Sequence, residues 1–515
     1  MTKALMITGT SSSAGKSTVV TALGRLALRQ GIRVAPFKAQ NMALNAAVTR
    51  SGHEIGRAQY TQAVACGLDA TVSMNPILLK PTSVMESQVV VRGRPWRSLS
   101  ASEYYATKNE LFDLVVESFR ELASSCDLVL LEGAGSPAEI NLLDSDIVNL
   151  RLADRLGIGS ILVGDIELGG VFAQIFGTYG ILPERYRGRL EGFIINKFRG
   201  DPTLLLSGID ELVRRCETTY FGTIPYASIT LPEEDSMALR REGFQYRLGA
   251  GSKLRIGVIA LPRIANFTDF DPLFGEGDLD VSYVDSSDQL EGLDLCIVPG
   301  SKSTVSDLSW MRSRALDRAI RRMLGGGGFV LGICGGYQIL GESIRDGVES
   351  DVDEVEGLDL LPIRTVFGRT KVTRRLSGSS TINNEDVAGY HIHHGVSHRT
   401  GGRPWLLLRA DPATELENQE LDATAFVETT AVIEDGAIDS TEHVFGVSLH
   451  GIFDADRHRA AFLTKIAHAR SKEFTSQLQF SLSQERSIDE LADLLDSTLD
   501  CEAIFARAVK VAIQW

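Results

Sequence analysis

The segment "MTKALMITGTSSSAGKSTVVTALGRLALRQG", residues 1–31, decides the fold of the first half of the chain. An apolar run over Ala4–Thr8 leads to Gly9, small residues follow as far as Gly15, and Ser17–Gln30 is amphipathic. This order predicts a strand, a phosphate-binding loop and a helix, because backbone amides at a helix start and a lysine side chain attract phosphate. Five residues separate the two glycines, one more than in the usual loop. The alternative is a Gly- and Ser-rich turn that carries an ordinary surface lysine.

The loop predicts an ATP site that also holds a divalent cation. Lys16 would neutralise the terminal phosphates, and Ser17 or Thr18 would hold Mg²⁺. The longer spacing, with Thr10 after the first glycine, resembles the loops of synthetases that make an acyl or carbamoyl phosphate, such as dethiobiotin synthetase. The expected ATP contacts are Gly9, Thr10, Ala14, Gly15, Lys16, Ser17, Thr18 and Asn196.

Two acidic residues at strand ends are candidates for the cation. Glu132 follows the apolar run in "LVLLEGAGSPAEINL", and Asp165 has the same position in "ILVGDIELGG". A lone acid at a strand end is more often a solvated rim residue, but beside a phosphate loop it becomes a candidate ligand. We therefore predict Ser17, Glu132 and Asp165 as the metal ligands. Asn196, in "GFIINKFRGD", could read adenine with its amide or form a turn.

Short apolar runs alternate with longer amphipathic stretches along most of the chain. This alternation predicts parallel sheets covered by helices on both faces. A second series begins at "LRIGVIALP" and ends near "HVFGVSLHGIFD". We expect an α/β protein with two parallel-sheet domains, at 1–230 and 253–458, a linker at 231–252 and a helical tail at 459–515. The predicted strands of the first domain are Ala4–Thr8, Val34–Phe37, Leu128–Leu131, Ile161–Val163 and Phe193–Ile195, and a helix is predicted over Glu103–Ser125.

Composition narrows the class of protein. The 515 residues carry a net charge of −15, which argues against a sequence-independent nucleic-acid binder and against an anionic membrane surface. No stretch approaches the length of a membrane span, and the N-terminus lacks a secretory pattern. The six cysteines are scattered singly, so neither a disulfide framework nor a zinc ribbon is indicated. We expect a reduced, cytoplasmic protein and leave open a homo-oligomer.

A second constellation surrounds Cys334. The sequence "GGGGFVLGICGGYQILG" has the spacing of a nucleophile elbow with cysteine in place of serine. A strand enters, glycines allow the sharp turn, and the start of the next helix favours the thiolate. The amides of Gly335 and of Gly300, in the "VPGS" turn, are the expected oxyanion donors. A buried structural cysteine is the alternative, and the surrounding glycines argue against it.

His450, at a strand end in "VFGVSLHGIFD", is the candidate base for Cys334. Glutaminases of this kind usually read H-x-E, so that the glutamate orients the imidazole, but here Ile452 stands at that place. The sequence therefore implies either a dyad or a distant orienting group.

A further cluster, "GYHIHHG", puts His391 and His393 on one strand face and His394 on the other. Without a third ligand this is a weak zinc signal, and surface or substrate-facing histidines are the preferred interpretation.

A polar run after the second strand is a candidate substrate surface, although part of it could equally be the solvated face of a helix. The run comprises Gln40, Asn41, Asn45, Glu54, Arg57, Gln59 and Gln62. The residues predicted to contact substrate are Lys38, Gln40, Asn41, Asn45, Arg57, Gln59, Asn75 and Lys80.

Nearly the whole chain resembles the cobyric acid synthase family. The resemblance rests on "GTSSSAGKST", "APFKAQNMALNAAVT", "HEIGRAQ", "MNPILLKPTS", "LEGAGSPAEINL", "INKFRGD", "LPEEDSMAL", "PGSKSTVSDL", the Cys334 elbow and "LHGIFD". The absence of H-x-E also matches. Leu168 departs from the family motif, which has arginine there, and His391 and His394 also differ from it.

The resemblance implies a P-loop domain like that of dethiobiotin synthetase and a class I glutamine amidotransferase-like domain. It implies Cys334 as nucleophile and His450 as base, with ATP, Mg²⁺, glutamine and a corrinoid as partners. The implied reaction amidates the b, d, e and g carboxylates of adenosylcobyrinic acid a,c-diamide. The alternatives are an a,c-diamide synthase, another carboxylate-amidating synthetase, and a nucleotide-binding regulatory module with an inactive glutaminase.

Overall fold

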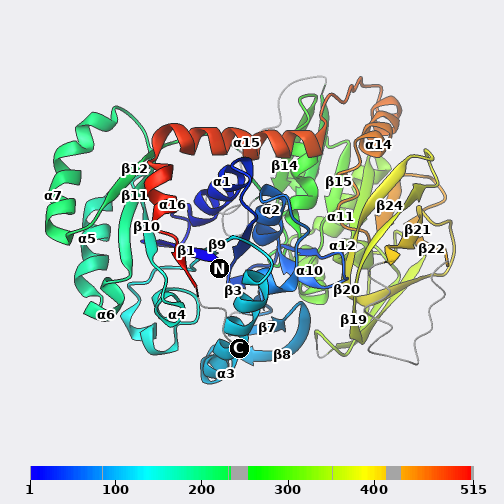
Figure 1. Cartoon of the computed structure of the whole chain (residues 1–515). Coiled ribbons are helices and arrows are strands. Elements are labelled where there is room, and N and C mark those ends of the chain that lie inside the picture. The colour runs from blue at the N-terminus through cyan, green and yellow to red at the C-terminus, as the bar shows by residue number, and fades with distance from the viewer. Residues whose placement is uncertain are drawn as a thin grey trace. The chain divides into compact units, whose positions relative to one another are not determined.

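The computed structural model describes residues 2–83, 85–229, 231–232, 253–350, 352–412 and 431–511 (Figure 1). The chain forms two compact units. The first comprises Met1–Met42, Ile55–Pro232 and Gln484–Trp515, and the second comprises Ala43–Glu54 and Glu233–Ser483. The domain predicted from the sequence over 1–230 thus has different bounds, and part of the predicted tail from residue 459 belongs to each unit. The linker expected at 231–252 lies outside the described residues, except for its first two.

The first unit is built on a mainly parallel sheet, and the strands predicted for it are confirmed. The strand order is β12-β11-β10-β1-β9-β2, so the strand before the glycine-rich loop lies between the two that end in the candidate acids. All neighbours along this path are parallel, and β25 adds an antiparallel edge to β1. The strands are β1 (Lys3–Gly9), β2 (Val34–Phe37), β9 (Leu128–Glu132), β10 (Ser160–Asp165), β11 (Leu190–Phe198), β12 (Tyr220–Pro225) and β25 (Val509–Lys510).

Helices from both ends of the chain complete the first unit. The predicted helices appear as α1 (Lys16–Arg29) and α3 (Ala101–Ala123). Helix α15 (Phe480–Thr498) runs beside α1, and Arg25 on α1 forms an ion pair of 2.6 Å with Glu485 (Figure 1). The other helices are α2 (Arg57–Ala65), α4 (Leu150–Leu156), α5 (Val171–Ile181), α6 (Glu184–Arg187), α7 (Leu206–Cys216), α16 (Cys501–Ala506), and the short 3₁₀ segments η1 (Val72–Met74), η2 (Ile140–Ser145) and η3 (Pro202–Leu205).

A small four-stranded sheet, which the sequence analysis did not predict, also belongs to the first unit. Its order is β3-β6-β7-β8, with β3 and β6 parallel and the other pairs antiparallel. The strands are β3 (Gln40–Met42), β6 (Ile77–Pro81), β7 (Glu86–Val91) and β8 (Arg94–Ser100), while β4 (Ala46–Val48) and β5 (Glu54–Gly56) form a separate pair.

The second unit contains the other predicted parallel sheet. Its order is β14-β13-β15-β16-β24-β23, parallel except for the last pair. The strands are β13 (Leu254–Ile259), β14 (Leu279–Val284), β15 (Leu295–Val298), β16 (Phe329–Ile333), β23 (Ala437–Ile438) and β24 (Val444–Val447). The helical segments are η4 (Phe267–Phe270), α9 (Asp271–Phe274), η5 (Asp288–Leu290), α10 (Thr304–Ser313), α11 (Leu316–Gly325), α12 (Gly335–Ile339) and α14 (Asp456–Ala469).

A second sheet of this unit, mostly antiparallel, was also not predicted. It has the order β18-β17-β19-β21-β22, with β20 paired to β19. Its strands are β17 (Ser343–Asp346), β18 (Val352–Glu356), β19 (Ile363–Ser380), β20 (Asp386–Arg399), β21 (Leu406–Ala410) and β22 (Ile433–Asp435). The two-parallel-sheet α/β fold is thus confirmed, with antiparallel sheets added to each unit.

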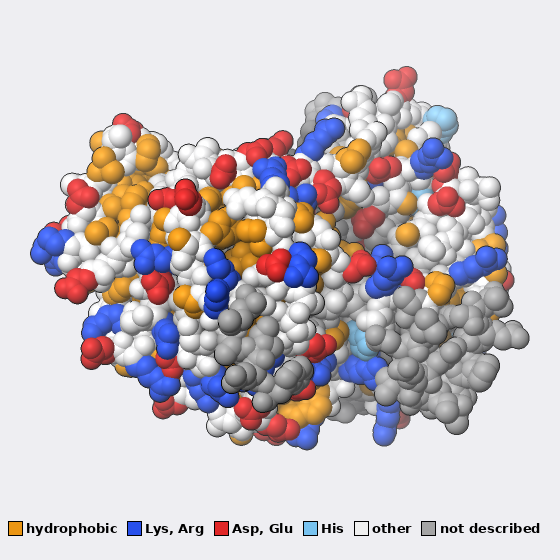
Figure 2. Space-filling view, in the orientation of Figure 1, with side chains coloured by type: hydrophobic (Ala, Val, Ile, Leu, Met, Phe, Trp, Pro, Cys, Tyr) orange, Lys and Arg blue, Asp and Glu red, His pale blue; other side chains and the backbone are white. Residues whose placement is uncertain are grey.

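The surface shows mixed charge. In the face drawn in Figure 2, acidic and basic side chains are interspersed among polar and apolar ones. No helix in the described part of the chain has the length and apolar character needed to cross a membrane.

The packing of α15 against the first sheet gives a stability prediction. Leu495 is fully buried in the same apolar cluster as Leu5 and Leu23. Leu495→Ala removes that packing and should lower the free energy of unfolding by about 2–5 kcal/mol. Guanidinium denaturation followed by circular dichroism measures the change. Leu482→Ala, on the same helix but 52% exposed, is the matched control and should change it by less than about 0.5 kcal/mol. Equal effects of both substitutions would contradict this role of α15.

Candidate active site

The glycine-rich loop has the predicted strand–loop–helix structure. Strand β1 ends at Gly9 and α1 begins at Lys16. Gly15, the residue before the helix, has φ 100° and ψ 21°, a left-handed conformation that favours glycine. The Lys16 Nζ donates hydrogen bonds to the carbonyl oxygens of Ser11, at 2.9 Å, and Gly135, at 3.0 Å. The lysine is buried and folds back over its own loop, so an ordinary surface lysine is ruled out.

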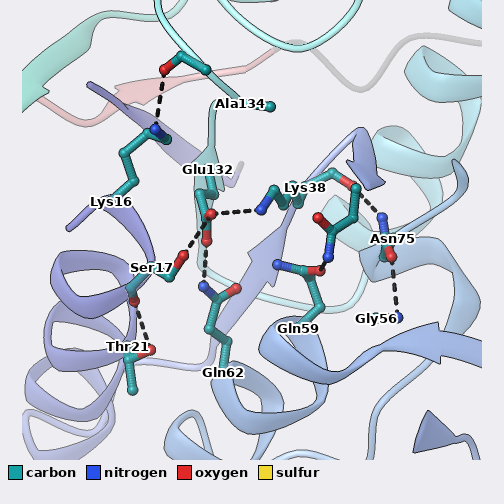
Figure 3. Close-up of polar contacts among 12 residues, drawn as sticks. Lys16, Ser17, Thr21, Lys38, Gly56, Gln59, Gln62, Asn75, Glu132 and Ala134 are labelled. Atoms are coloured by element: carbon teal, nitrogen blue, oxygen red, sulfur yellow. Dashed lines mark hydrogen bonds and ion pairs between the residues drawn. The ribbon is translucent and has the colours of Figure 1, made fainter. Parts of the chain in front are cut away.

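Glu132 is the centre of the polar network beside this loop. Its Oε1 accepts from the hydroxyl of Ser17 and the ammonium of Lys38, each at 2.8 Å, and its Oε2 accepts from the amide of Gln62 at 2.5 Å (Figure 3). Burial acts to raise the pKa of this carboxyl. The Lys38 charge and the hydrogen bonds from Gln62 and Ser17 outweigh that effect, and the pKa is lowered from its usual value. Glu132 is therefore an ionised, buried carboxylate adjacent to the Ser17 hydroxyl.

Four of the predicted substrate residues lie together beside Glu132 (Figure 3). Asn75 donates to the Lys38 carbonyl at 3.0 Å, and its own oxygen accepts from the Gly56 amide at 3.2 Å. Asn41 donates to the Gln59 side chain at 3.0 Å. A side chain at Gly56 would approach the Asn41 amide to 2.6 Å, so these side-chain amides would have to shift to accommodate it. Asn75 thereby bonds the backbone of Lys38, and the buried Asn41–Gln59 pair lies next to the same Gly56.

The remaining predicted substrate residues have other surroundings. Gln40 accepts a 2.6 Å hydrogen bond from Tyr104, and the Arg57 guanidinium lies 5.7 Å from the Tyr60 ring centre. Lys80 is buried on β6. Asn45 belongs to the second unit rather than the first.

The alternative of a solvated helix face is wrong for two residues of α2. Gln59 and Gln62 are both buried, and Gln62 reaches Glu132. The polar spacing of this helix therefore marks an internal network.

Asp165 and Asn196 hold the loop from the neighbouring strands. Asp165 forms a 2.8 Å ion pair with Lys197, and the same ammonium donates to the Ser13 carbonyl at 2.9 Å. The Asn196 amide donates to the Ala14 carbonyl at 2.9 Å. The Asn196 amide nitrogen is thus bonded to the loop backbone, and Asp165 is neutralised by a lysine. Metal binding by Asp165 and adenine binding by Asn196 stay predictions.

Cys334 has the predicted elbow between β16 and α12. Its φ of 51° and ψ of −107° lie outside the regions that non-glycine residues normally occupy. A side chain at Gly332 would come within 2.7 Å of the Gly336 backbone, and one at Gly336 would collide with the Val298 carbonyl. The two glycines are required because the strand, the turn and the helix pack in direct backbone contact. A side chain at Gly335 would likewise lie 2.8 Å from the Ser301 amide.

His450 has an orienting carboxylate, supplied by Asp269. The Asp269 Oδ2 lies 2.6 Å from the His450 Nδ1, and its Oδ1 accepts from the Gly451 amide at 3.0 Å. Asp269 precedes His450 by 181 residues and lies in η4, so no local motif marked it. A side chain at Gly300 would be 3.2 Å from the imidazole, which places this predicted oxyanion donor beside the base.

The charge of His450 depends on its two partners. Burial acts to lower its pKa, whereas Asp269 and Cys334 raise it, and the result is a pKa of about 10. The imidazolium therefore prevails at neutral pH. Because this value lies above the usual 6.5, the pairing stabilises the fold fully below about pH 6.5 and is lost as the pH rises through about 10.

The histidine strand β20 lies next to this site. Tyr390 and His450 pair through their backbones, and their rings stack with centres 5.3 Å apart. His391 and His393 face one another at 5.0 Å, and burial lowers the pKa of both. His391 and His394 are buried, so the surface interpretation is wrong for them. Across the described ranges, no group of three or more His, Cys, Asp or Glu residues could hold a metal.

Two family models match the chain, one over the residues of each site. Residues 5–237 match the CobQ/CobB/MinD/ParA nucleotide binding domain, and residues 255–458 match the CobB/CobQ-like glutamine amidotransferase domain. Together with the two sites, these matches define a glutamine-dependent amide ligase. The cobyric acid synthase of Clostridium acetobutylicum is 41% identical over 98% of both chains, and that of Desulforudis audaxviator is 43% identical over 98% of both. That of Chloroflexus aurantiacus is 44% identical over 90% of this chain and 91% of its own. The chain belongs to the cobyric acid synthase family.

Asp269 gives a prediction for the glutaminase reaction. Asp269→Asn removes the charge that raises the pKa of His450 and changes the hydrogen bond that fixes its ring. The kcat for glutamine hydrolysis should fall by about 10²–10⁴-fold. The alkaline limb of the pH–rate profile should move to lower pH, because the imidazolium deprotonates earlier.

Glutamate release across a pH series measures both effects. The matched control, Asp278→Asn, changes an exposed aspartate of the same unit and should leave the profile unaltered. An unchanged kcat in Asp269→Asn would show that His450 acts without an orienting group.

Proposed function

We propose that the enzyme converts side-chain carboxylates of a corrinoid into primary amides, using ATP and glutamine. The substrate is adenosylcobyrinic acid a,c-diamide, and amidation of its b, d, e and g carboxylates gives adenosylcobyric acid. The observation that most directly supports this substrate is that identity to cobyric acid synthases extends through both units, over 98% of the chain.

The glutaminase half supplies ammonia. The Cys334 thiolate attacks the side-chain amide carbon of glutamine, and the His450 imidazolium gives its proton to the departing nitrogen. Asp269 holds the imidazole with its other nitrogen directed away from the carboxylate. Gly300 and Gly335 are the proposed amide donors to the oxyanion. Water then hydrolyses the thioester, releasing glutamate and restoring the thiol.

The synthetase half activates the acceptor. A corrinoid carboxylate oxygen attacks the γ-phosphorus of ATP, ADP leaves, and an acyl phosphate forms. Ammonia attacks the acyl carbon, phosphate leaves with the bonding electrons, and a proton is released as the amide forms. Lys16 is the residue of this chain that neutralises phosphate charge, and Lys38 is placed to bind a carboxylate once Glu132 engages a cation.

The oxygen donors beside the loop fit a magnesium ion. Ser17 and Glu132 present a hydroxyl and an ionised carboxylate 2.8 Å apart, and Mg²⁺ is commonly held by one or two such groups together with nucleotide phosphates. When bound, the ion neutralises charge on the transferring phosphoryl group. Asp165 remains a further candidate, in competition with its ion pair to Lys197.

Removing the nucleophile separates the two half-reactions. Cys334→Ala should lower glutamine-dependent amidation by at least about 10³-fold, while ammonium-dependent amidation stays within about twofold, because free ammonia bypasses the thioester. Chromatography of the corrinoid products with each nitrogen source measures both rates. Cys216→Ala, at a half-buried cysteine of the first unit, is the control and should keep both.

Three outcomes of this experiment would contradict parts of the proposal. Loss of both activities in Cys334→Ala would indicate a structural role for the cysteine. An unmodified protein that amidates only the a and c carboxylates would be an a,c-diamide synthase. A protein that amidates no corrinoid would overturn the substrate.

Ser17 tests the proposed magnesium site. Ser17→Ala removes one oxygen donor but leaves the Lys38–Glu132 ion pair in place. The Mg²⁺ concentration for half-maximal ammonium-dependent amidation should rise by about tenfold or more, and calorimetry should show a matching loss in MgATP affinity. Ser12→Ala, an exposed loop serine, should change neither quantity. An unchanged Mg²⁺ requirement in Ser17→Ala would remove Ser17 from the metal site.

A further inference from the structure

The segment Ala43–Glu54 lies in the sequence between two segments of the first unit, but it packs as part of the second unit. It follows β3 and precedes α2, yet it packs with Glu233–Ser483. At its far end, Glu54 forms a 2.6 Å ion pair with Lys371 of β19, and both side chains are buried. A buried ion pair holds well only in a fixed geometry, so this contact anchors the segment.

Two asparagines join the start of this segment to the turn that carries Asp269. The Asn45 side-chain oxygen accepts from the Phe267 amide at 2.9 Å. In return, the Asn266 oxygen accepts from the Ala46 amide at 3.0 Å. All of these groups are buried, and leaving any one unpaired would cost about 1–3 kcal/mol.

The bond from Phe267 matters because η4 is short and lacks its own cap. The residue before it, Asn266, has a left-handed φ of 52° and makes no side-chain cap hydrogen bond. The first amides of a helical turn have no partner within the turn. Asn45 satisfies one of them from 222 residues away, and thereby fixes the turn from which Asp269 reaches His450.

The same segment also bonds the tyrosine that stacks on His450. Tyr390 stacks on the imidazole at 5.3 Å, and its hydroxyl donates to the Ala46 carbonyl at 3.0 Å. Asn45 and Ala46 therefore support both the turn that carries the Asp269 carboxylate and the aromatic side chain that stacks on the imidazole.

We propose that Asn45 and Tyr390 are positioning residues of the glutaminase, which hold the imidazole of His450 through the Ala43–Glu54 segment. This role replaces the substrate contact expected for Asn45 from the sequence. It rests on the proposed function only in taking His450 as the base for Cys334. The arrangement ties glutamine hydrolysis to a segment continuous in the chain with Asn41 and Gln59 of the ATP-binding unit.

Glutamine hydrolysis in Asn45→Ala and Tyr390→Phe tests the proposal. Tyr390→Phe keeps the stacked ring and removes only the hydroxyl bonded to Ala46. Each variant should lower kcat about 5–50-fold with the KM for glutamine within about twofold, since the base and not the substrate is displaced. The double variant should lose less than the product of the single effects, because both act through one segment.

The pH profile distinguishes positioning from general weakening. A displaced imidazole should interact less strongly with Asp269, so the alkaline limb of the pH profile of kcat should move to lower pH. The other charged or titratable groups facing His450 are Asp269, Cys334, His391 and His393, all unchanged in these variants. The matched control is Asn383→Ala, which removes an acceptor for a backbone amide elsewhere in the same unit and should keep kcat and the limb unchanged.

The MgATP affinity of the same variants is also measured. It should stay within about twofold of that of the unmodified protein. Unchanged glutamine hydrolysis in both variants would overturn the proposal, as would an equal loss of hydrolysis and MgATP affinity. If Asn45→Ala lost only ammonium-dependent amidation, that result would support the substrate contact predicted for Asn45 from the sequence. Because hydrolysis is assayed without corrinoid, failure of the proposed substrate would appear separately, as intact hydrolysis with no amidated product.

Discussion

A buried carboxylate needs a hydrogen-bond donor for each of its oxygens, and the sites around Glu132 and Asp269 both depend on this requirement. An unpaired buried charge costs several kcal/mol, whereas a fully bonded one is fixed in place. Glu132 meets the requirement through an ammonium, a hydroxyl and an amide. Asp269 meets it through an imidazolium and a backbone amide. Ser17 and Lys38 at the first carboxylate, and His450 at the second, are also groups with a proposed role in the reaction, so bonding the buried acid fixes their positions.

The two sites reach this condition by different routes through the chain. In the first unit, the site residues lie at the ends of parallel strands. Strand β1 leads into the glycine-rich loop, β9 ends at Glu132 and β10 ends at Asp165. The carboxyl ends of parallel strands meet at one edge of a sheet, so adjacency in the sheet suffices. In the second unit, Cys334 and His450 likewise follow the neighbouring parallel strands β16 and β24. Asp269 comes instead from a short turn, which has to be held by contacts from elsewhere.

This difference explains what could be predicted from the sequence. Glu132, Cys334 and His450 follow apolar runs that indicate buried strands, so their places near the strand ends were predictable. Lys16 was predictable because it follows the glycine-rich loop at the start of a helix. Asp269 has no such marker: "NFTDFDPL" contains three aspartates and asparagines of similar local appearance. The missing H-x-E glutamate implied either a dyad or a distant orienter, and only the tertiary structure identified it. The sequence also contained no sign that Asn45 belongs to the second unit, because Asn41 and Gln59 on either side of it belong to the first.

Backbone strain at Cys334 shows why the surrounding contacts must be rigid. A non-glycine residue in its conformation costs about 1–3 kcal/mol, and it persists only where the packing leaves no alternative. Gly332 and Gly336 provide that packing, since a methyl group on either would clash with neighbouring backbone. A side chain held so firmly tolerates little displacement of its reaction partner, because an error of about 1 Å in a reacting pair can cost about 10²-fold in rate. Cys334 lies in a turn fixed by close backbone packing, whereas His450 is held by the side chains of Asp269 and Tyr390, which come from two separate segments. The base is therefore the member of the pair whose position substitutions outside the site can most readily change.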